Sequence, residues 1–176
     1  MINVVLFEPE IPQNTGNIMR TCAGTGVKLH LIKPLGFGLD EKSIKRSAVN
    51  YIEHCDYTIY ENIEEFFQKN KGSYYFLTRY GSKPHTSFDY SNTNENIYLI
   101  FGKESTGIPK EILKNHLETC IRIPINSNIR ALNLSNSASS SRLLSFEETV
   151  LHFIISARSF TALSPSNSSV SYCFFS

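Results

Sequence analysis

The chain has 176 residues, of which 41% are hydrophobic and 19% charged, and its formal net charge is +1 at pH 7. This composition is typical of one globular domain and excludes an intrinsically disordered chain. No apolar run approaches the ~20 residues that a membrane-spanning helix needs, so we expect a soluble, cytoplasmic protein without a membrane partner. A charge near zero does not decide for or against a nucleic-acid partner, because a local basic face matters more than the sum.

The first residues, MINVVLFEPE, carry no basic segment ahead of their apolar run. This favours a first strand over residues 2–7 rather than a secretion signal. Four cysteines lie far apart without a C-x-x-C pair, which indicates reduced, buried thiols: Cys22, Cys55, Cys120 and Cys173. Because the histidines also lack metal-ligand spacing, we expect no metal site.

Short apolar runs alternate with helical patterns along the rest of the chain. The expected strands are 2–7, 28–33, 74–79, 97–102 and 120–125, and the expected helices are 14–25, 40–49, 62–70 and 108–116. Asn14 is expected to cap the first helix and Gly26 to stop it. Near-continuous apolar runs are typical of strands covered on both faces. The sequence therefore predicts an α/β fold with an open, mainly parallel sheet and helices on both faces.

Three loops that follow expected strands are rich in glycine and small polar residues: EPEIPQNTGNIMRTC, FGKESTGIP and IRIPINSNIRALNLSNS. The carboxyl ends of parallel strands share one edge, which is where an open α/β sheet binds its ligand. Each residue also has an ordinary structural explanation: Asn14 and Ser135 can cap helices, and Glu104 can be solvated. The conjunction of the three loops favours a site.

Residues 2–137 resemble the SPOUT class of RNA methyltransferases, and within it the small single-domain tRNA (cytidine/uridine-34) 2'-O-methyltransferases. The similarity lies in VVLFEPEIPQNTGNIMRTCAGTG, LHLIKPLGF, FGKESTGIP and IRIPINSNIRALNLSNS, in that order. The resemblance implies a C-terminal trefoil knot and S-adenosylmethionine as cofactor. It also implies 2'-O-methylation of the wobble nucleotide, position 34, in the tRNA anticodon stem-loop, as cytidine or modified uridine. A homodimer is implied, with each site completed by the partner subunit.

The same resemblance implies roles for individual residues. The catalytic residues would be Arg20, Asn14 and Ser135. Because a guanidinium stays protonated, Arg20 would act either as the base or as an electrostatic organiser of ribose and phosphate. The cofactor contacts would be Leu77, Gly102, Glu104, Gly107, Ile123, Ala131, Leu132 and Asn133. The RNA contacts would be Lys42, Lys45, Arg46, Lys103 and Arg130.

The resemblance stops after Ser137. Residues 138–176 carry twelve serines, and the run 139–141 stands where the family has an amphipathic helix that closes the knot and the dimer. Serine is a poor helix former, so we expect two parts: a methyltransferase domain, 1–137, and an atypical Ser-rich segment, 138–176, that replaces this helix, for example after a shifted reading frame. The alternative function is a catalytically impaired RNA-binding relative.

Overall fold

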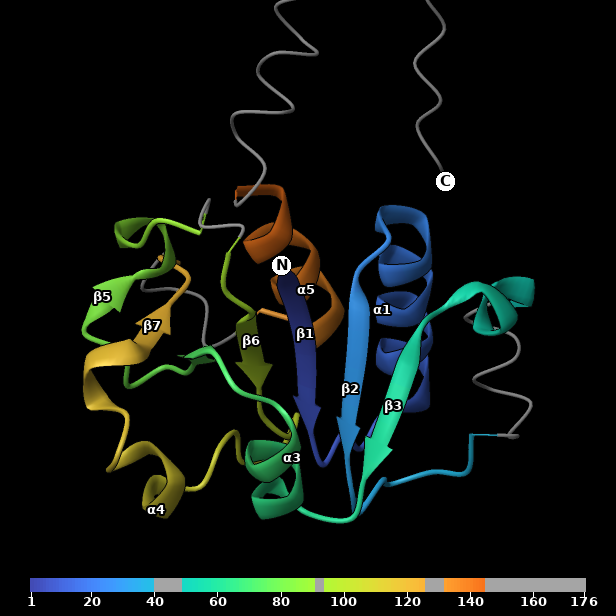
Figure 1. Ribbon diagram of the computed structural model, residues 1–176, viewed down its shortest axis with the longest axis horizontal. Coiled ribbons are helices and arrows are strands. Elements are labelled where there is room, and N and C mark those ends of the chain that lie inside the picture. Colours follow the sequence, from blue (N-terminus) through green and yellow to red (C-terminus); the bar gives the residue numbers. More distant parts are fainter. Residues whose placement is uncertain (40–48, 91–93, 126–131, 145–176) are drawn as a thin grey trace, which may run out of the picture. The chain divides into compact units, whose positions relative to one another are not determined.

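The computed structural model describes residues 1–39, 49–90, 94–125 and 132–144. Its sheet has seven strands in the order β3-β2-β1-β6-β4-β7-β5 (Figure 1). The strands are β1 (Ile2–Phe7), β2 (Lys28–Ile32), β3 (Tyr57–Tyr60), β4 (Ser73–Leu77), β5 (Lys83–Pro84), β6 (Ile97–Phe101) and β7 (Cys120–Arg122). All the ladders between these strands are parallel, which confirms the predicted parallel α/β sheet.

Helices lie on both faces of this sheet (Figure 1). They are the α-helices α1 (Pro12–Thr25), α3 (Ile63–Lys69), α4 (Lys110–Leu113) and α5 (Leu134–Leu144), with the 3-10 helices η1 (Val49–His54), η2 (His85–Ser87) and η3 (Leu117–Thr119). Alternate residues of a strand point to opposite faces. Accordingly, Leu6 of β1 packs in the cluster that contains Met19 of α1, whereas Phe7 packs in the cluster that contains Phe66 of α3.

Helix α1 begins two residues earlier than predicted, so the expectation that Asn14 caps it is wrong. The helix starts at Pro12, and the N-cap residue Ile11 makes no side-chain cap bond. Proline suits this position because its missing N–H would have no partner within the helix. The end of the helix is as predicted, since Gly26 adopts a left-handed φ of 65°. The amide side chain of Asn14 is thereby available for contacts outside the helix.

Two strands were not predicted. Strand β3 mixes polar and aromatic residues, and it pairs only with β2 among the described strands. Because it mixes polar and aromatic residues, β3 does not show the near-continuous apolar pattern of a central strand. Strand β5 has two residues, too few for any periodic pattern.

Helix α5 runs through the serine-rich stretch to Leu144, although serines were expected to disfavour a helix there. Ala138 is 4% exposed and packs with Leu134 in the cluster that includes α1 residues. Burial against α1 outweighs the small differences in intrinsic helix propensity. The expected division at residue 137 stays a prediction, since most of the segment 138–176 lies outside the described residues. The predicted knot likewise stays a prediction.

The described cysteines Cys22, Cys55 and Cys120 are buried free thiols, as predicted, and Cys173 lies outside the described residues. Within the part of the chain that the structure describes, no helix has the length and apolarity to cross a membrane.

The buried side chain of His30 gives the fold a specific pH dependence. His30 is 1% exposed, its Nδ1 lies 2.9 Å from the Tyr60 hydroxyl, and burial lowers its pKa from 6.5 to about 4. The unfolded chain therefore binds a proton that the folded chain excludes as the pH falls from 6.5 towards 4. We expect this group to remove about 2 kcal/mol of unfolding free energy between pH 7 and pH 5.

Urea unfolding of wild type and His30→Gln at both pH values measures this effect. The variant is expected to be less stable at pH 7 but to lose less stability on acidification, because glutamine does not titrate. An equal loss in both proteins would contradict the assignment to His30.

Candidate active site

A cavity of about 800 Å³ opens at the carboxyl ends of β4, β6 and β7, a size typical of small-molecule sites, which span roughly 300–1,000 Å³. Its walls come from four segments and from the start of α1. The lining residues are Ile11, Asn14, Leu77, Thr78, Arg79, Tyr80, Phe101, Gly102, Lys103, Glu104, Ser105, Thr106, Gly107, Ile108, Arg122, Ile123, Ile125, Leu132, Asn133, Leu134 and Ser137. The cavity adjoins the β1–β6 pair, where the strand order reverses direction, which is the position expected for a ligand.

Glu104 joins the loop after β6 to the start of α1. Its Oε2 accepts a hydrogen bond of 2.8 Å from the backbone N–H of Glu10. Its Oε1 accepts bonds from the backbone N–H of Ile11, at 3.4 Å, and from Asn14 Nδ2, at 3.0 Å. The carboxylate thus supplies acceptors to backbone donors at the helix N-terminus, where a negative charge is also favoured by the helix dipole.

Asn14 connects Glu104 to the third loop through hydrogen bonds on both sides of its amide group. Because a carboxylate only accepts, the Nδ2 of Asn14 faces Glu104 and its Oδ1 accepts from Asn133 Nδ2 at 2.9 Å. Asn133 in turn accepts on Oδ1 from the Ser135 backbone N–H, at 2.9 Å, and from the Ser135 hydroxyl, at 2.6 Å. Asn133 therefore caps α5, and each amide in the relay has a defined orientation. Three loops distant in sequence form one hydrogen-bonded unit.

A second set of contacts holds the first two loops together. The Glu10 carboxylate accepts from the Ser105 backbone N–H, at 2.9 Å, and from its hydroxyl, at 2.8 Å, and these bonds lower the pKa of Glu10. Lys103 forms an ion pair with Glu8, which adopts a left-handed φ of 47°. Non-glycine residues rarely adopt this conformation without support from their surroundings.

Glycines let the backbone turn tightly against the cavity. A Cβ on Gly102 would lie 2.3 Å from the carbonyl carbon of Gly107 and 2.4 Å from the N of Ile108. Gly107 has a φ of 76°, which disfavours any other residue. The loop therefore presents main-chain atoms to the cavity, with no side chain at residue 102.

Comparison with known proteins agrees with this geometry. Residues 1–140 match the SpoU rRNA Methylase family. The chain belongs to this family. It is 44% identical over 140 residues to the tRNA (cytidine(34)-2'-O)-methyltransferase of Methylovorus glucosotrophus, a match that covers 78% of this chain and 89% of the relative.

Two solved structures extend the comparison. One, described as "Structural insights into the 2-OH methylation of C/U34 on tRNA", has a TM-score of 0.79 and 32% identity, and the match covers 85% of this chain and 97% of that one. The other is an AdoMet-bound rRNA methyltransferase from Sinorhizobium meliloti, with a TM-score of 0.74 and 22% identity over 84% of this chain and 56% of that one. At that identity the second structure supports the fold alone.

The SpoU-family cavity brings together most residues that the sequence assigned to the cofactor. Those that line it are Leu77, Gly102, Glu104, Gly107, Ile123, Leu132 and Asn133, and Ala131 lies outside the described residues. The apolar side chains and the main-chain atoms around Gly102 suit an adenosine moiety, which needs apolar contact and a few fixed hydrogen bonds. Across the described residues, no cluster of three or more His, Cys, Asp or Glu side chains could hold a metal ion.

The predicted catalytic residues do not all line the cavity. Asn14 lines the cavity, and Ser135 is buried behind Asn133. Arg20 is exposed on α1 and does not line the cavity of its own chain. The six residues from Asn14 to Arg20 correspond to about 9 Å along a helix axis. The role of Arg20 therefore stays a prediction.

The predicted RNA contacts lie mostly outside the described residues: Lys42, Lys45, Arg46 and Arg130. Lys103 is described, and its ammonium group is paired with Glu8. Arg79, Tyr80 and Arg122 also line the cavity, although they were not predicted from the sequence. For Arg79 and Tyr80, a signal was present in the sequence: they form a basic and aromatic pair in LTRYG, directly after the strand that supplies Leu77.

Replacing Glu104 with glutamine tests the hydrogen-bonded unit. The glutamine NH₂ group would face donors that need an acceptor, so we expect a loss of about 2–3 kcal/mol in unfolding free energy. Thermal and urea unfolding measure this loss. Glu111→Gln is the matched control, because Glu111 is an exposed residue of α4. Equal stability of the two variants would show that Glu104 does not hold the loops together.

Proposed function

We propose that this chain catalyses S-adenosylmethionine-dependent 2'-O-methylation of the ribose of nucleotide 34, cytidine or modified uridine, in the tRNA anticodon stem-loop. The observation that carries the proposal is the Glu104–Asn14–Asn133–Ser135 unit beside the cavity. It joins the three loops whose sequences match the family. Relatives named for this reaction support the choice of substrate. The site of action would be the cytoplasm.

The cofactor would be held by main-chain atoms near Leu77, Gly102 and Ile123, with Leu132 against its apolar surface. S-adenosylmethionine supplies an activated methyl group attached to a positively charged sulfur. Glu104 does not need to contact the cofactor in this arrangement, because its oxygens accept bonds from α1. Its task is to fix the loop that begins at Gly102.

The residues of the chain then have to position the ribose and remove its proton. Alignment of the 2'-hydroxyl with the methyl group can account for about 7–11 kcal/mol of the barrier. Asn14 and Asn133, whose amides are held in one orientation, would supply that positioning. Arg20 would organise ribose and phosphate charge or assist removal of the proton.

A homodimer is part of the proposal. Since Arg20 does not line the cavity of its own chain, it would contribute to the site of the partner subunit. Mixed dimers test this arrangement. Arg20→Ala and Gly102→Ala subunits, each of low activity as homodimers at a limiting S-adenosylmethionine concentration, are expected to regain part of the activity when mixed, because one of the two sites then carries both intact residues. No recovery in demonstrably mixed dimers would place Arg20 outside the partner's site.

The reaction is tested directly with anticodon stem-loops. The purified protein is incubated with methyl-labelled S-adenosylmethionine and RNA carrying C34 or U34, and the nucleosides are analysed by mass spectrometry. We expect 2'-O-methylation at nucleotide 34 and none on an otherwise identical RNA with a 2'-deoxyribose there. RNA binding without methyl transfer would instead support the impaired RNA-binding relative.

A further inference from the structure

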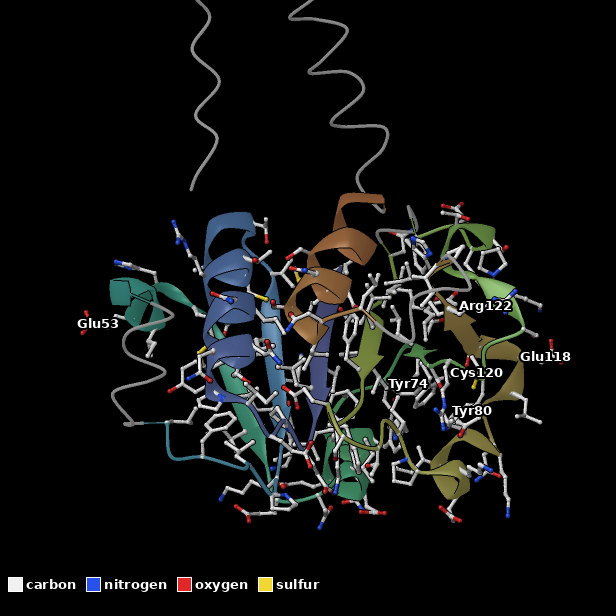
Figure 2. All side chains as sticks on the ribbon, turned by 180° about the vertical axis from the view of Figure 1, so that it is seen from behind. Glu53, Tyr74, Tyr80, Glu118, Cys120 and Arg122 are labelled. Atoms are coloured by element: carbon white, nitrogen blue, oxygen red, sulfur yellow. The ribbon has the colours of Figure 1, made fainter. Side chains whose placement is uncertain are left out.

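An exposed aromatic side chain with two cations against its ring lies at the mouth of the cavity. Tyr80 is 51% exposed, yet it also lines the cavity, so its ring lies between the cavity and solvent. Arg79 and Arg122 line the same cavity and are exposed. Figure 2 shows Tyr80 and Arg122 in the part of the molecule that contains β7.

The cations contact the ring directly. Arg79 Nη2 donates a 2.7 Å hydrogen bond to the Tyr80 hydroxyl, and its guanidinium carbon lies 4.9 Å from the ring centroid. The Lys110 ammonium lies 5.4 Å from the same centroid. The bond from Arg79 is also the main cause of a lowered pKa for Tyr80. Two positive charges therefore lie against a π surface that is still half exposed.

This charge is not neutralised by neighbouring acids in the described part of the chain. The ion pairs found there involve Lys28, Lys33, Lys69, Lys83 and Lys103, and none involves Arg79, Lys110 or Arg122. Lys103, by contrast, is paired with Glu8 at the other side of the loop. The group around Tyr80 is thus suited to a polyanion.

The backbone beneath Tyr80 is held in place. The Thr78 N–H donates to the Ile121 carbonyl at 2.9 Å, and the Gly81 N–H donates to the Thr78 carbonyl at 3.1 Å. A Cβ on Gly81 would lie 2.4 Å from the carbonyl carbon of Ile121, so the turn rests directly on β7. A ring on a fixed turn loses little entropy when it binds a flat partner.

We propose that Tyr80, with Arg79, Lys110 and Arg122, forms an RNA-binding platform on which an unpaired base next to the methylated nucleotide stacks while the cations contact adjacent phosphates. The proposal rests on the proposed function, because it takes the anticodon loop as the ligand. Single-stranded RNA is recognised through stacking of splayed bases on aromatic or arginine planes, together with phosphate contacts. When the ribose of one nucleotide enters the cavity, the neighbouring nucleotides have to leave the base stack at the rim of the cavity, where Tyr80 lies.

The test compares affinity for RNA with affinity for the cofactor. Tyr80→Ala is expected to weaken binding of an anticodon stem-loop, measured by fluorescence anisotropy, by about tenfold, with S-adenosylmethionine affinity by calorimetry unchanged. Tyr80→Phe keeps the ring and should bind RNA nearly as wild type does. Leu117→Ala is the control, since Leu117 is an exposed apolar residue, 66% exposed, that does not line the cavity.

The cations are tested by salt dependence. Lys110→Ala should lower the slope of log affinity against log salt by about one unit for the lost phosphate contact. Lys28→Ala should leave the slope unchanged, because Lys28 begins β2 and pairs with Asp56 next to β3, in the half of the sheet away from β4 and β7.

The outcomes separate this proposal from the function itself. Lower cofactor affinity with unchanged RNA affinity in Tyr80→Ala would assign the ring to the cofactor and overturn the platform. Unchanged values for both ligands in that variant, with wild type active on RNA, would also overturn it. Weaker RNA binding by Tyr80→Ala in a protein that never methylates RNA would support the platform and reject the enzymatic function.

Discussion

Replacing Arg20 by alanine is expected to lower methyl transfer to nucleotide 34 by about 10²–10⁴-fold, the range typical of a lost acid–base group. The affinity for S-adenosylmethionine should stay nearly the same, because Arg20 is proposed to act on the ribose and phosphate of the RNA and not on the cofactor. Single-turnover methylation and calorimetry measure the two quantities separately.

Arg20→Lys distinguishes the two roles that the guanidinium could have. Lysine keeps the positive charge but lacks the planar fork that binds a phosphate or ribose edge through two parallel bonds. Partial activity in Arg20→Lys would favour charge organisation, and a pH–rate profile that follows the lysine would favour proton transfer. Equal loss of cofactor affinity and of methyl transfer in Arg20→Ala would contradict both roles.

Replacing Gly102 by alanine is expected to reduce S-adenosylmethionine affinity by at least about tenfold, or about 1.4 kcal/mol. The added Cβ would lie 2.3 Å from the Gly107 carbonyl carbon and 2.4 Å from the Ile108 nitrogen. Both atoms belong to the backbone, so the loop must move rather than a flexible side chain. Calorimetry on the purified variant measures the loss.

Gly24→Ala is the matched control for this substitution. Gly24 lies in α1, and a Cβ there would meet nothing within 4 Å. Alanine in a helix is favoured over glycine by about 0.5–1 kcal/mol, so this variant should be slightly more stable and bind the cofactor normally. Normal binding by Gly102→Ala as well would show that the tight turn is not needed for the cofactor.

Patterns of neighbouring residues were sufficient to predict much of the fold, because the features they predict have causes that lie close in sequence. The central strands β1 and β6 are near-continuous apolar runs, and Gly26 ends α1 in the left-handed conformation that glycine permits. The end of α5 shows the limit of this reasoning. Its serines have low helix propensity, but Ala138 is buried in the cluster that includes α1 residues, and that burial is set by residues distant in sequence.

The parallel α/β class, the family and the three loops around the cavity could be predicted from the amino-acid sequence, because strand patterns and a specific motif lie in consecutive residues. The groups that these residues contact could be identified only in the folded chain. Glu104 holds the start of α1, Asn14 faces Asn133 instead of capping its helix, and Tyr80 gathers cations from the turn after β4 and the start of α4. Such contacts depend on the order of strands in the sheet, which places residues about ninety positions apart within hydrogen-bonding distance.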